Sequence, residues 1–456
     1  MKSREFSYLF EFVGLSLGVN MVEVPPDQAS LCYGESRSAG AELFVLRGLR
    51  ASGPLEVDSD GNLSFDIFEE IAEFLLDKRN KTLPCDLDKH GRVPYSHLAQ
   101  GVHLGLAPVN QILLKLKQIL KQHLGIRCLD IWPEGKKCAV VLTHDVDHPI
   151  NVRPFEVLKE IPKLLLRPNL RSKFKIPRKI IKSGFAALSG QGYHWAFDHI
   201  IKAESAQGFR STFFFASRTD EEGHSLDVEY EVSEDRFRRL FKQLSALGFE
   251  IGLHASYLAY RTRGAFQIER TRLEEAAQTS VRGLRHHFWH MSVPFWNTLG
   301  RHFEAGFEYD ASVAFNDHPG FRLGTGLPFF PWDPIGGKKI GTLQIPTVVM
   351  DGAVFDRPAE TKTWSSIVKP PATGVAEGLE KLQDTLDKLA DCSGVGAVDW
   401  HVRMCWAQNK RFSEWGECYE LFLKELGGRS DIWVATCSEI TNYWRERADK
   451  LRHGVV

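Results

Sequence analysis

Residues 138–148 read CAVVLTHDVDH, and this stretch decides the fold. A short apolar run at 140–142 passes directly into two histidines and two aspartates, His144, Asp145, Asp147 and His148. A run of this kind is typical of a strand buried on both faces, where charged groups need partners. The stretch therefore predicts a buried strand whose carboxyl end carries reactive side chains.

Working outward from this stretch, apolar runs alternate with segments of helical periodicity from residue 137 onward. The predicted strands cover residues 139–145, 211–216, 250–254, 281–286, 307–314, 343–350, 396–401 and 431–436. The predicted helices cover residues 234–247, 266–280, 294–303, 375–390 and 413–426. Strands separated by helices indicate a parallel sheet, and about eight such units favour a distorted (β/α) barrel of seven to eight strands. We expect this barrel to span residues 131–445.

The first unit is interrupted by a basic stretch at residues 167–182, RPNLRSKFKIPRKIIK. We interpret it as a solvated insertion, with contact to a polyanion as the alternative.

Residues 1–130 have a different pattern, with short strand-like pieces at 30–33, 42–46 and 62–66. Two segments with helical spacing follow, at 67–76 and 108–124. This pattern predicts a small α/β accessory domain ahead of the barrel.

The composition excludes several classes of function. The chain has 456 residues, 43% of them hydrophobic and 25% charged, and its net charge is −1. A net charge this close to zero produces no positive electrostatic field that would attract nucleic acid. No window of the sequence is long and apolar enough for a membrane span. Glu5 and Glu11 interrupt the apolar N-terminus, so no signal peptide is expected, and the eight cysteines show no CxxC pair. A cytoplasmic location is the expectation.

Other predicted strands also end in groups that can do chemistry: His254, then Arg285 with His286 and His287, then Asp310, then Asp399 with His401 and Arg403. In a (β/α) barrel the carboxyl ends of the strands meet at one rim, where active sites lie. Each group alone could have a purely structural role, because a single histidine at a strand end is more often structural than catalytic or metal-binding. Together, however, they predict a site at this rim.

Asp145 and Asp147 are two positions apart, so on a strand they share a face at about 6–7 Å. If both carboxyl groups are ionised away from water, a cation must lie nearby. The alternative is that the two aspartates lie in a loop and cap the helix that follows. One aspartate on a divalent metal, with the other free as a base, satisfies this requirement. Carboxylate and imidazole ligands predict zinc or a similar transition metal.

The motifs THDVD, EIGLH, an arginine-bearing strand in RHHFWH and a late strand ending in VDWH, in this order, resemble the polysaccharide deacetylase (NodB-homology, carbohydrate esterase) family. The resemblance covers residues 137–440 and is to a divergent branch with a THDVD start. It implies that Asp145 is the general base, Asp147 and His254 bind metal, Arg285 holds the base and His401 is the general acid.

The chain departs from the family pattern after His254, because the family has a second metal-binding histidine four positions later and this chain has Leu258. His287 is the best-placed substitute as the third ligand, and His144 and His148 are the other candidates. Asp399 is expected to orient His401 or to form a salt link with Arg403.

The predicted substrate-binding residues are Asp310, Trp332 and Tyr257. Asp310, like Asp399, would also favour a protonated His401. Six aromatic residues could stack on sugar rings or simply form the upper core of the barrel: Tyr257, Phe288, Trp289, Phe330, Trp332 and Trp406.

The resemblance implies a metal-dependent hydrolase that removes an acetyl group from an N-acetylated sugar or oligosaccharide. The implied cofactor is a divalent metal, with zinc first and cobalt, nickel or manganese as alternatives. Two other hypotheses stay open: a hydrolase of a non-sugar amide, and a metal-free saccharide-binding or scaffold protein.

Overall fold

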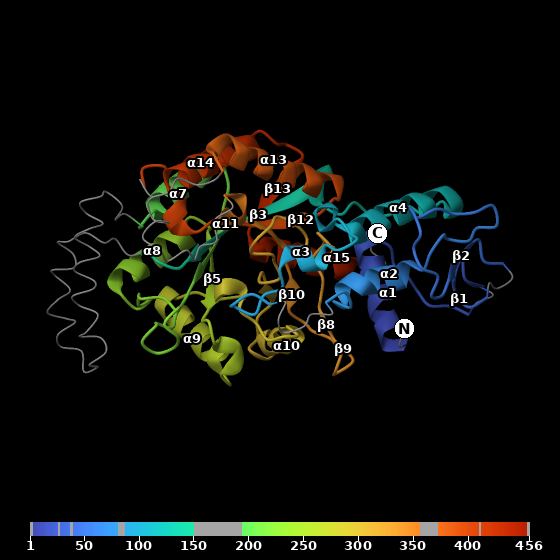
Figure 1. Cartoon of the computed structure of the whole chain (residues 1–456), viewed down its shortest axis with the longest axis horizontal. Coiled ribbons are helices and arrows are strands. Elements are labelled where there is room, and N and C mark those ends of the chain that lie inside the picture. The colour runs from blue at the N-terminus through green and yellow to red at the C-terminus, as the bar shows by residue number, and fades with distance from the viewer. Residues whose placement is uncertain are drawn as a thin grey trace.

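The computed structural model describes residues 3–25, 28–36, 40–80, 87–149, 194–355, 373–409 and 412–453. The predicted basic insertion at 167–182 lies outside the described residues. Figure 1 shows an elongated molecule with the N-terminal elements at one end and the helices α7 and α8 at the other.

A curled parallel sheet forms the centre of the molecule. Its strands are β3 (Cys138–Val146), β4 (Thr212–Phe215), β5 (Glu250–Ala255), β6 (Gly283–His286), β7 (Tyr309–Asp310), β10 (Leu343–Gln344), β11 (Thr347–Met350), β12 (Val395–Asp399) and β13 (Ile432–Ala435). The strand order is β10-β7-β6-β5-β4-β3-β12-β11, with β13 beside the first half of β3. All nine residues of β3 are buried, as expected for a strand covered on both faces. The predicted parallel barrel-like sheet is confirmed.

The segment predicted as one strand at 343–350 is split into β10 and β11 and joins the two ends of the strand order. β10 pairs with β7, whereas β11 pairs with β12. Pro346 has no N–H for a strand ladder, so the pairing changes partner at this residue. Its carbonyl accepts a hydrogen bond from the backbone N–H of Ala397 at 2.8 Å.

Strand β7 is shorter than the predicted 307–314. Beyond Asp310, the carbonyl of Ala311 accepts hydrogen bonds from the Arg285 guanidinium at 3.1 Å and the Thr347 hydroxyl at 2.8 Å. Side-chain donors thus satisfy a carbonyl oxygen that the backbone N–H groups of a neighbouring strand would satisfy in a regular sheet.

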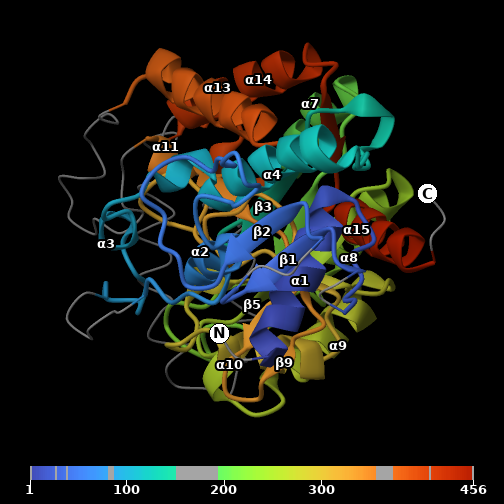
Figure 2. The same ribbon diagram turned by 90° about the vertical axis from the view of Figure 1, so that its right-hand side faces the viewer.

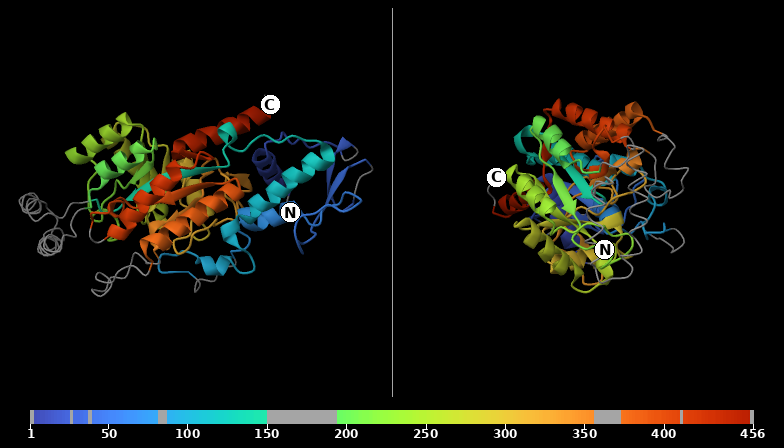
Figure 3. Two further views of the ribbon diagram at one scale, coloured as in Figure 1. Left: turned by 90° about the horizontal axis from the view of Figure 1, so that it is seen from above. Right: turned by 90° about the vertical axis from the view of Figure 1, so that its left-hand side faces the viewer.

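Helices cover the outside of the sheet, as Figure 3 shows from two further directions. They are α7 (Phe197–Ala206), α8 (Asp235–Ala246), α9 (Ala265–Ala277), α10 (Trp296–Glu304), α11 (Asp351–Val354), α13 (Val375–Asp391), α14 (Ser413–Gly427) and α15 (Cys437–Arg452). In α8 the buried residues are Phe237, Leu240, Phe241 and Leu244. This three-four spacing produces one apolar stripe, which packs on the sheet. Helices α7 and α15 were not among the predicted elements.

The N-terminal region contains α1 (Ser3–Leu17), β1 (Leu31–Gly34), β2 (Leu43–Leu46), α2 (Ile67–Leu75), α3 (Tyr95–Leu98) and α4 (Pro108–Leu124). The predicted strand at 62–66 is reduced to single bridges at Asn62 and Leu63. Asp66 instead caps α2 by accepting hydrogen bonds from the N–H groups of Phe68 and Glu69. Seen end-on, these elements lie in front of the barrel (Figure 2).

One hydrophobic cluster runs from the N-terminal region into the barrel. It includes Leu9 and Val13 of α1 together with the inward-facing Ala139 and Val141 of β3. The N-terminal region therefore fills the end of the barrel at which the strands begin. The predicted boundary at residue 130 stays a prediction, although this shared core means that the two parts are packed as one body.

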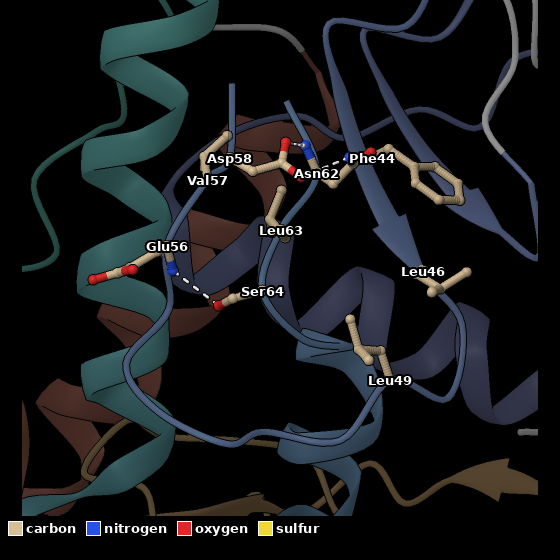
Figure 4. Close-up of a pocket in the computed structure, with 9 residues that line it drawn as sticks. All are labelled: Phe44, Leu46, Leu49, Glu56, Val57, Asp58, Asn62, Leu63 and Ser64. Carbon is tan, nitrogen blue, oxygen red and sulfur yellow. Dashed lines mark hydrogen bonds between the residues drawn. The ribbon is translucent and has the colours of Figure 1, made fainter. Parts of the chain in front are cut away.

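A pocket on the N-terminal region lies between β2 and the loop that returns to α2. Figure 4 shows its lining residues, Phe44, Leu46, Leu49, Glu56, Val57, Asp58, Asn62, Leu63 and Ser64. None of them is a predicted site residue. Among the described residues, no helix combines the length and hydropathy that crossing a bilayer requires.

Candidate active site at the carboxyl rim of the barrel

Alternation along the strands determines which polar side chains enter the barrel. In β3, Ala139 and Val141 face the interior core, whereas Val140 and Leu142 pack under the outer helices. The inner face continues through Thr143 to Asp145 and Asp147 because side chains of a strand alternate with period two. The same alternation turns His254 of β5, Arg285 of β6 and Asp399 of β12 toward the interior.

Arg285 connects two buried carboxylates in this interior. Its Nη1 lies 3.0 Å from Oδ1 of Asp145 and 3.0 Å from Oδ1 of Asp399. The guanidinium also donates to the hydroxyls of Thr143 at 2.9 Å and Thr347 at 3.1 Å. Arg285 and Asp399 are fully buried and Asp145 is 4% exposed, so the pairing provides the counter-charge that burial demands.

The two carboxyl groups titrate differently. Burial raises the pKa of Asp399 to about 7, and the neighbouring Asp145 adds to this effect. Burial acts on Asp145 in the same direction, but His254, Arg285 and His401 outweigh it and lower the pKa of Asp145. Asp145 is thus the member that loses its proton at lower pH, so it is ionised at neutral pH and can act as a base.

Asp147, His254 and His287 form a cluster that could hold a metal ion, with one ligand atom from each lying within 4.8 Å of the others. Oδ1 of Asp147 is 3.2 Å from Nε2 of His254 and 3.5 Å from Nε2 of His287. Within the described part of the chain, neither Oδ1 of Asp147 nor Nε2 of His254 has a hydrogen bond of acceptable geometry. Two buried, unsatisfied ligand atoms aimed at one another fit a divalent cation.

Each imidazole of the cluster faces an oxygen on its far side, although only His254 is hydrogen-bonded there. Nδ1 of His254 lies 3.2 Å from the carbonyl oxygen of Arg285, which requires the proton on Nδ1 and leaves Nε2 free to bind. Nδ1 of His287 lies 3.8 Å from Oδ1 of Asp227. Asp227 is itself held by the N–H groups of Tyr257 at 2.7 Å and His224 at 2.8 Å.

His401, which follows β12, lies on the other side of Asp147. Its Nε2 is 3.2 Å from Oδ2 of Asp147, and its Nδ1 is 2.9 Å from Oδ2 of Asp351. The Asp351 carboxylate also accepts the backbone N–H of His401 at 2.7 Å. Asp351, at the start of α11, therefore fixes both the position and the orientation of the imidazole.

The charges around Asp147 are strongly coupled. Burial opposes ionisation of Asp147, but His401, His287 and His254 outweigh it and hold its pKa well below the usual range. Burial likewise disfavours the charged form of His401, yet Asp351 and Asp147 outweigh it and raise its pKa well above the usual value. His401 is thereby kept as a proton donor.

Two predicted roles for Asp399 and Arg403 are wrong. Asp399 neither orients His401 nor pairs with Arg403, because it faces Arg285 inside the barrel. Arg403 instead contacts Oδ2 of Asp147 at 3.0 Å.

The structure brings Asp145, Asp147, His254, Arg285, His287 and His401 together, but it places the alternative ligands elsewhere. His144 points outward, with Nε2 2.7 Å from Glu204 and Nδ1 2.7 Å from the carbonyl oxygen of Trp400. His148, an exposed residue, is not one of the three residues whose ligand atoms cluster, although Asp147 and His287 are near enough to act on its pKa. The outward direction of His144 follows from the alternation that turns its neighbour Asp145 inward.

Of the predicted substrate-binding residues, only Tyr257 is near the cluster. It is 7% exposed and stacks on His290 with ring centroids 3.9 Å apart. Asp310 faces outward from β7 and is fully buried beside Ser312 and His302. Trp332 lies in β8 (Trp332–Asp333) and packs on Tyr8 of α1. The predicted substrate contacts of Asp310 and Trp332 are therefore corrected, since neither residue reaches the site.

Two residues of the site were not predicted: Asp351 and Asp227. Asp351 follows β11 directly, so the rule that polar residues at strand ends converge would have included it. Asp227 lies in a loop between predicted elements, where hydrophobic periodicity gives no signal.

The fold and the site together define an α/β protein with a curled parallel sheet and a buried carboxylate–imidazole centre at its carboxyl rim. No protein-family model matches the sequence, and no curated protein matches it either.

Solved structures do show similarity to this chain. One is a protein of Mycobacterium smegmatis described as a polysaccharide deacetylase, with a TM-score of 0.44, 20% identity, and coverage of 69% of this chain and 93% of that chain. An allantoinase has a TM-score of 0.42 and 14% identity, covering 69% and 92%. A Pseudomonas aeruginosa protein described as a polysaccharide deacetylase has a TM-score of 0.42 and 14% identity, covering 69% and 93%. Two of these three structures carry the description polysaccharide deacetylase, which is the name of the family that the motifs resemble.

Proposed function

We propose that this protein is a metal-dependent hydrolase that removes the acetyl group from an N-acetylated sugar. One observation carries the proposal: a buried base, a buried acid and an adjoining carboxylate–imidazole cluster converge at the carboxyl rim of the barrel. A binding site would need neither a poised base nor a poised acid, whereas amide hydrolysis needs both.

Asp147, His254 and His287 would hold the divalent cation. When bound there, the cation would polarise the acetamide carbonyl and lower the pKa of water. A set of one carboxylate and two imidazoles leaves coordination positions open for water and substrate, as catalytic zinc sites require.

The residues of the chain account for the proton transfers. Asp145, held by Arg285, takes the proton of the water that attacks the acetamide carbon. His401, held by Asp351, donates a proton to the nitrogen as the C–N bond breaks. Water and the acetamide are thereby converted into acetate and the free sugar amine.

A second candidate function, a metal-free saccharide-binding protein, is favoured by one contact. Arg403 and His401 both face Oδ2 of Asp147, so two cationic groups already lie beside this carboxylate. In that case the buried charges would balance without a metal ion. Only measurement of metal content separates the two candidates.

The proposal predicts about one divalent ion per chain by elemental analysis of the purified protein, and acetate release from a panel of N-acetylated sugars. A chelator should abolish acetate release, and added zinc should restore it. Asp145→Asn should keep the metal and lower kcat by about 10²–10⁴-fold. His254→Ala should lose the metal.

Asp384→Asn is the matched control, because this aspartate is more than half exposed on α13. It should leave both metal content and turnover unchanged. A wild-type protein without stoichiometric metal and without acetate release would favour the binding protein instead, and an active Asp145→Asn variant would contradict the assignment of the base.

A further inference from the structure

The turn that presents His287 has an unusual backbone. His287 follows the last residue of β6, and the next two residues, Phe288 and Trp289, have φ values of 57° and 49°. Bulky side chains rarely adopt this left-handed region, because it is sterically strained for them. Such a turn persists only where surrounding contacts hold it.

Contacts to this turn come from residues 87–93 of the N-terminal region, which we call the strap. The His90 ring stacks on Phe288 with centroids 4.6 Å apart and planes at 19°. Arg92 donates from Nη1 to the carbonyl oxygen of Phe288 at 3.2 Å. The strap thus holds both the side chain and the backbone of the residue next to His287.

The strap also contacts the support on the far side of His287. Nδ1 of His90 lies 2.9 Å from the Tyr257 hydroxyl, and His90 is 4% exposed. The N–H of Tyr257 donates to Asp227, the carboxylate that faces Nδ1 of His287. The strap, Tyr257 and Asp227 therefore form one continuous set of contacts around His287.

Hydrogen bonds within the strap hold its conformation, so it can act as a fixed support. The Asp88 carboxylate accepts the N–H groups of His90 at 2.8 Å and Arg92 at 2.9 Å, and the Arg92 Nε at 2.7 Å. Gly91 has φ 70°, and a side chain there would meet His290 at 4.0 Å. The turn from Asp88 to Arg92 is thereby closed on itself and packed against the barrel.

We propose that the N-terminal region supplies positioning residues, His90 and Arg92, that hold His287 as the third metal ligand. The inference rests on the proposed function, because it needs a metal at Asp147, His254 and His287. It also explains how the chain can have Leu258 where the family has its second metal-binding histidine. His287, which follows the next strand, serves as the ligand instead, and the strap holds the strained turn after it.

The test measures metal affinity by competition between the full-length apoprotein and a chromophoric chelator, using Zn²⁺, and by the visible absorption of bound Co²⁺. His90→Ala and Arg92→Met should each weaken Zn²⁺ binding by about 10–100-fold and change the Co²⁺ spectrum, as loss of supporting groups around metal ligands does. His90→Phe keeps an aromatic ring over Phe288 and should recover part of the loss. His287→Ala provides the reference for a lost ligand.

His103→Ala is the matched control, since His103 is an exposed histidine of the same N-terminal region, and it should bind Zn²⁺ as the wild type does. Near-ultraviolet circular dichroism identifies variants that fail to fold, and for these Arg92→Lys and His90→Phe provide the milder comparison. Wild-type affinity and spectrum in folded strap variants would overturn this inference and leave the proposed function standing. A wild-type protein that binds no Zn²⁺ would overturn the proposed function itself.

Discussion

Arg285 is the residue that allows two carboxyl groups to be buried together inside the barrel. Its guanidinium contacts Asp145 and Asp399 and stacks over Phe214 at 4.7 Å. The planar group with five donors can satisfy several acceptors at once, which a lysine could not do. Together with His254, Arg285 lowers the pKa of Asp145 in a place where burial alone would raise it.

Asp351→Asn should shift the pH dependence of turnover. The Asp351 carboxylate raises the pKa of His401, so its removal lowers that pKa. Because the general acid must be protonated, activity is lost as pH rises through this pKa, and the alkaline limb of kcat/KM should move to lower pH. A pH–rate profile with bound metal measures the shift, and Asp351→Glu should move the limb less. An unchanged alkaline limb in Asp351→Asn would contradict the role of His401.

Asp310→Asn should stabilise the protein at high pH. Burial raises the pKa of Asp310 to about 7, so the folded state retains a proton that the unfolded state releases near pH 4. The stability that the protonated form contributes is complete below pH 4 and is lost as pH rises to 7. An uncharged asparagine avoids this loss, so the gain should grow over this window to at most about 4 kcal/mol.

Urea denaturation between pH 4 and 8 measures this difference in the free energy of unfolding. The exposed Asp384→Asn should show no such dependence. A gain that is equal at pH 4 and pH 8 would mean that Asp310 is not the group whose titration is linked to folding.

At the scale of elements, one buried aspartate connects α2 to the β1–β2 unit. Asp66 caps α2 through Oδ1, while its Oδ2 accepts the N–H of Gly48 at 2.8 Å and the Tyr33 hydroxyl at 3.1 Å. Its side chain is fully buried. Removal of the carboxylate would therefore leave donors from three segments without their acceptor.

Asp66→Ala should lower the free energy of unfolding by about 2–4 kcal/mol, because it removes a helix cap and leaves buried donors unpaired. Thr436→Ala breaks the capping box at the partly buried start of α15. It should lower the free energy of unfolding by only about 1 kcal/mol. Chemical denaturation of both variants tests the order. Equal losses would show that the connections of Asp66 beyond its helix add nothing.

At the scale of the whole molecule, the N-terminal region and the barrel are joined by buried polar contacts as well as by the shared core. Asn110 of α4 donates to the carbonyl oxygen of Cys392 at 2.8 Å and accepts the N–H of Gly326 at 2.9 Å. These contacts favour one cooperative folding unit.

Denaturation followed by tryptophan fluorescence and by far-ultraviolet circular dichroism should therefore give one coincident transition. Asn110→Ala should shift both midpoints together, since it leaves its buried partners on the barrel side of the junction unpaired, at a cost of about 1–3 kcal/mol. The exposed Gln111→Ala is a neighbouring control that should leave the midpoints in place. Two separate transitions would mean that the regions fold independently.

The order of the barrel elements could be predicted from the sequence because buried strands and amphipathic helices have different hydrophobic periods. The position of the site at the carboxyl rim followed from the polar residues that end these strands, and this prediction included the two aspartates, His254, Arg285 and His401. Asp310 was wrongly predicted to contact the substrate. Side chains alternate along β7, so the side chain of Asp310 points outward when Tyr309 and Ala311 point inward. Only the packing of Tyr309 and Ala311 in the interior core shows which of the two directions each side chain takes.

The sequence by itself determined the fold class and the kinds of group at the rim, since both follow from local periodicity and residue chemistry. Only the tertiary structure decided which groups meet: Asp351 with His401, Asp399 with Arg285, and the strap with the turn after His287. These pairs join residues far apart in the chain, and their contact depends on how strands and loops pack in three dimensions, which no local pattern encodes.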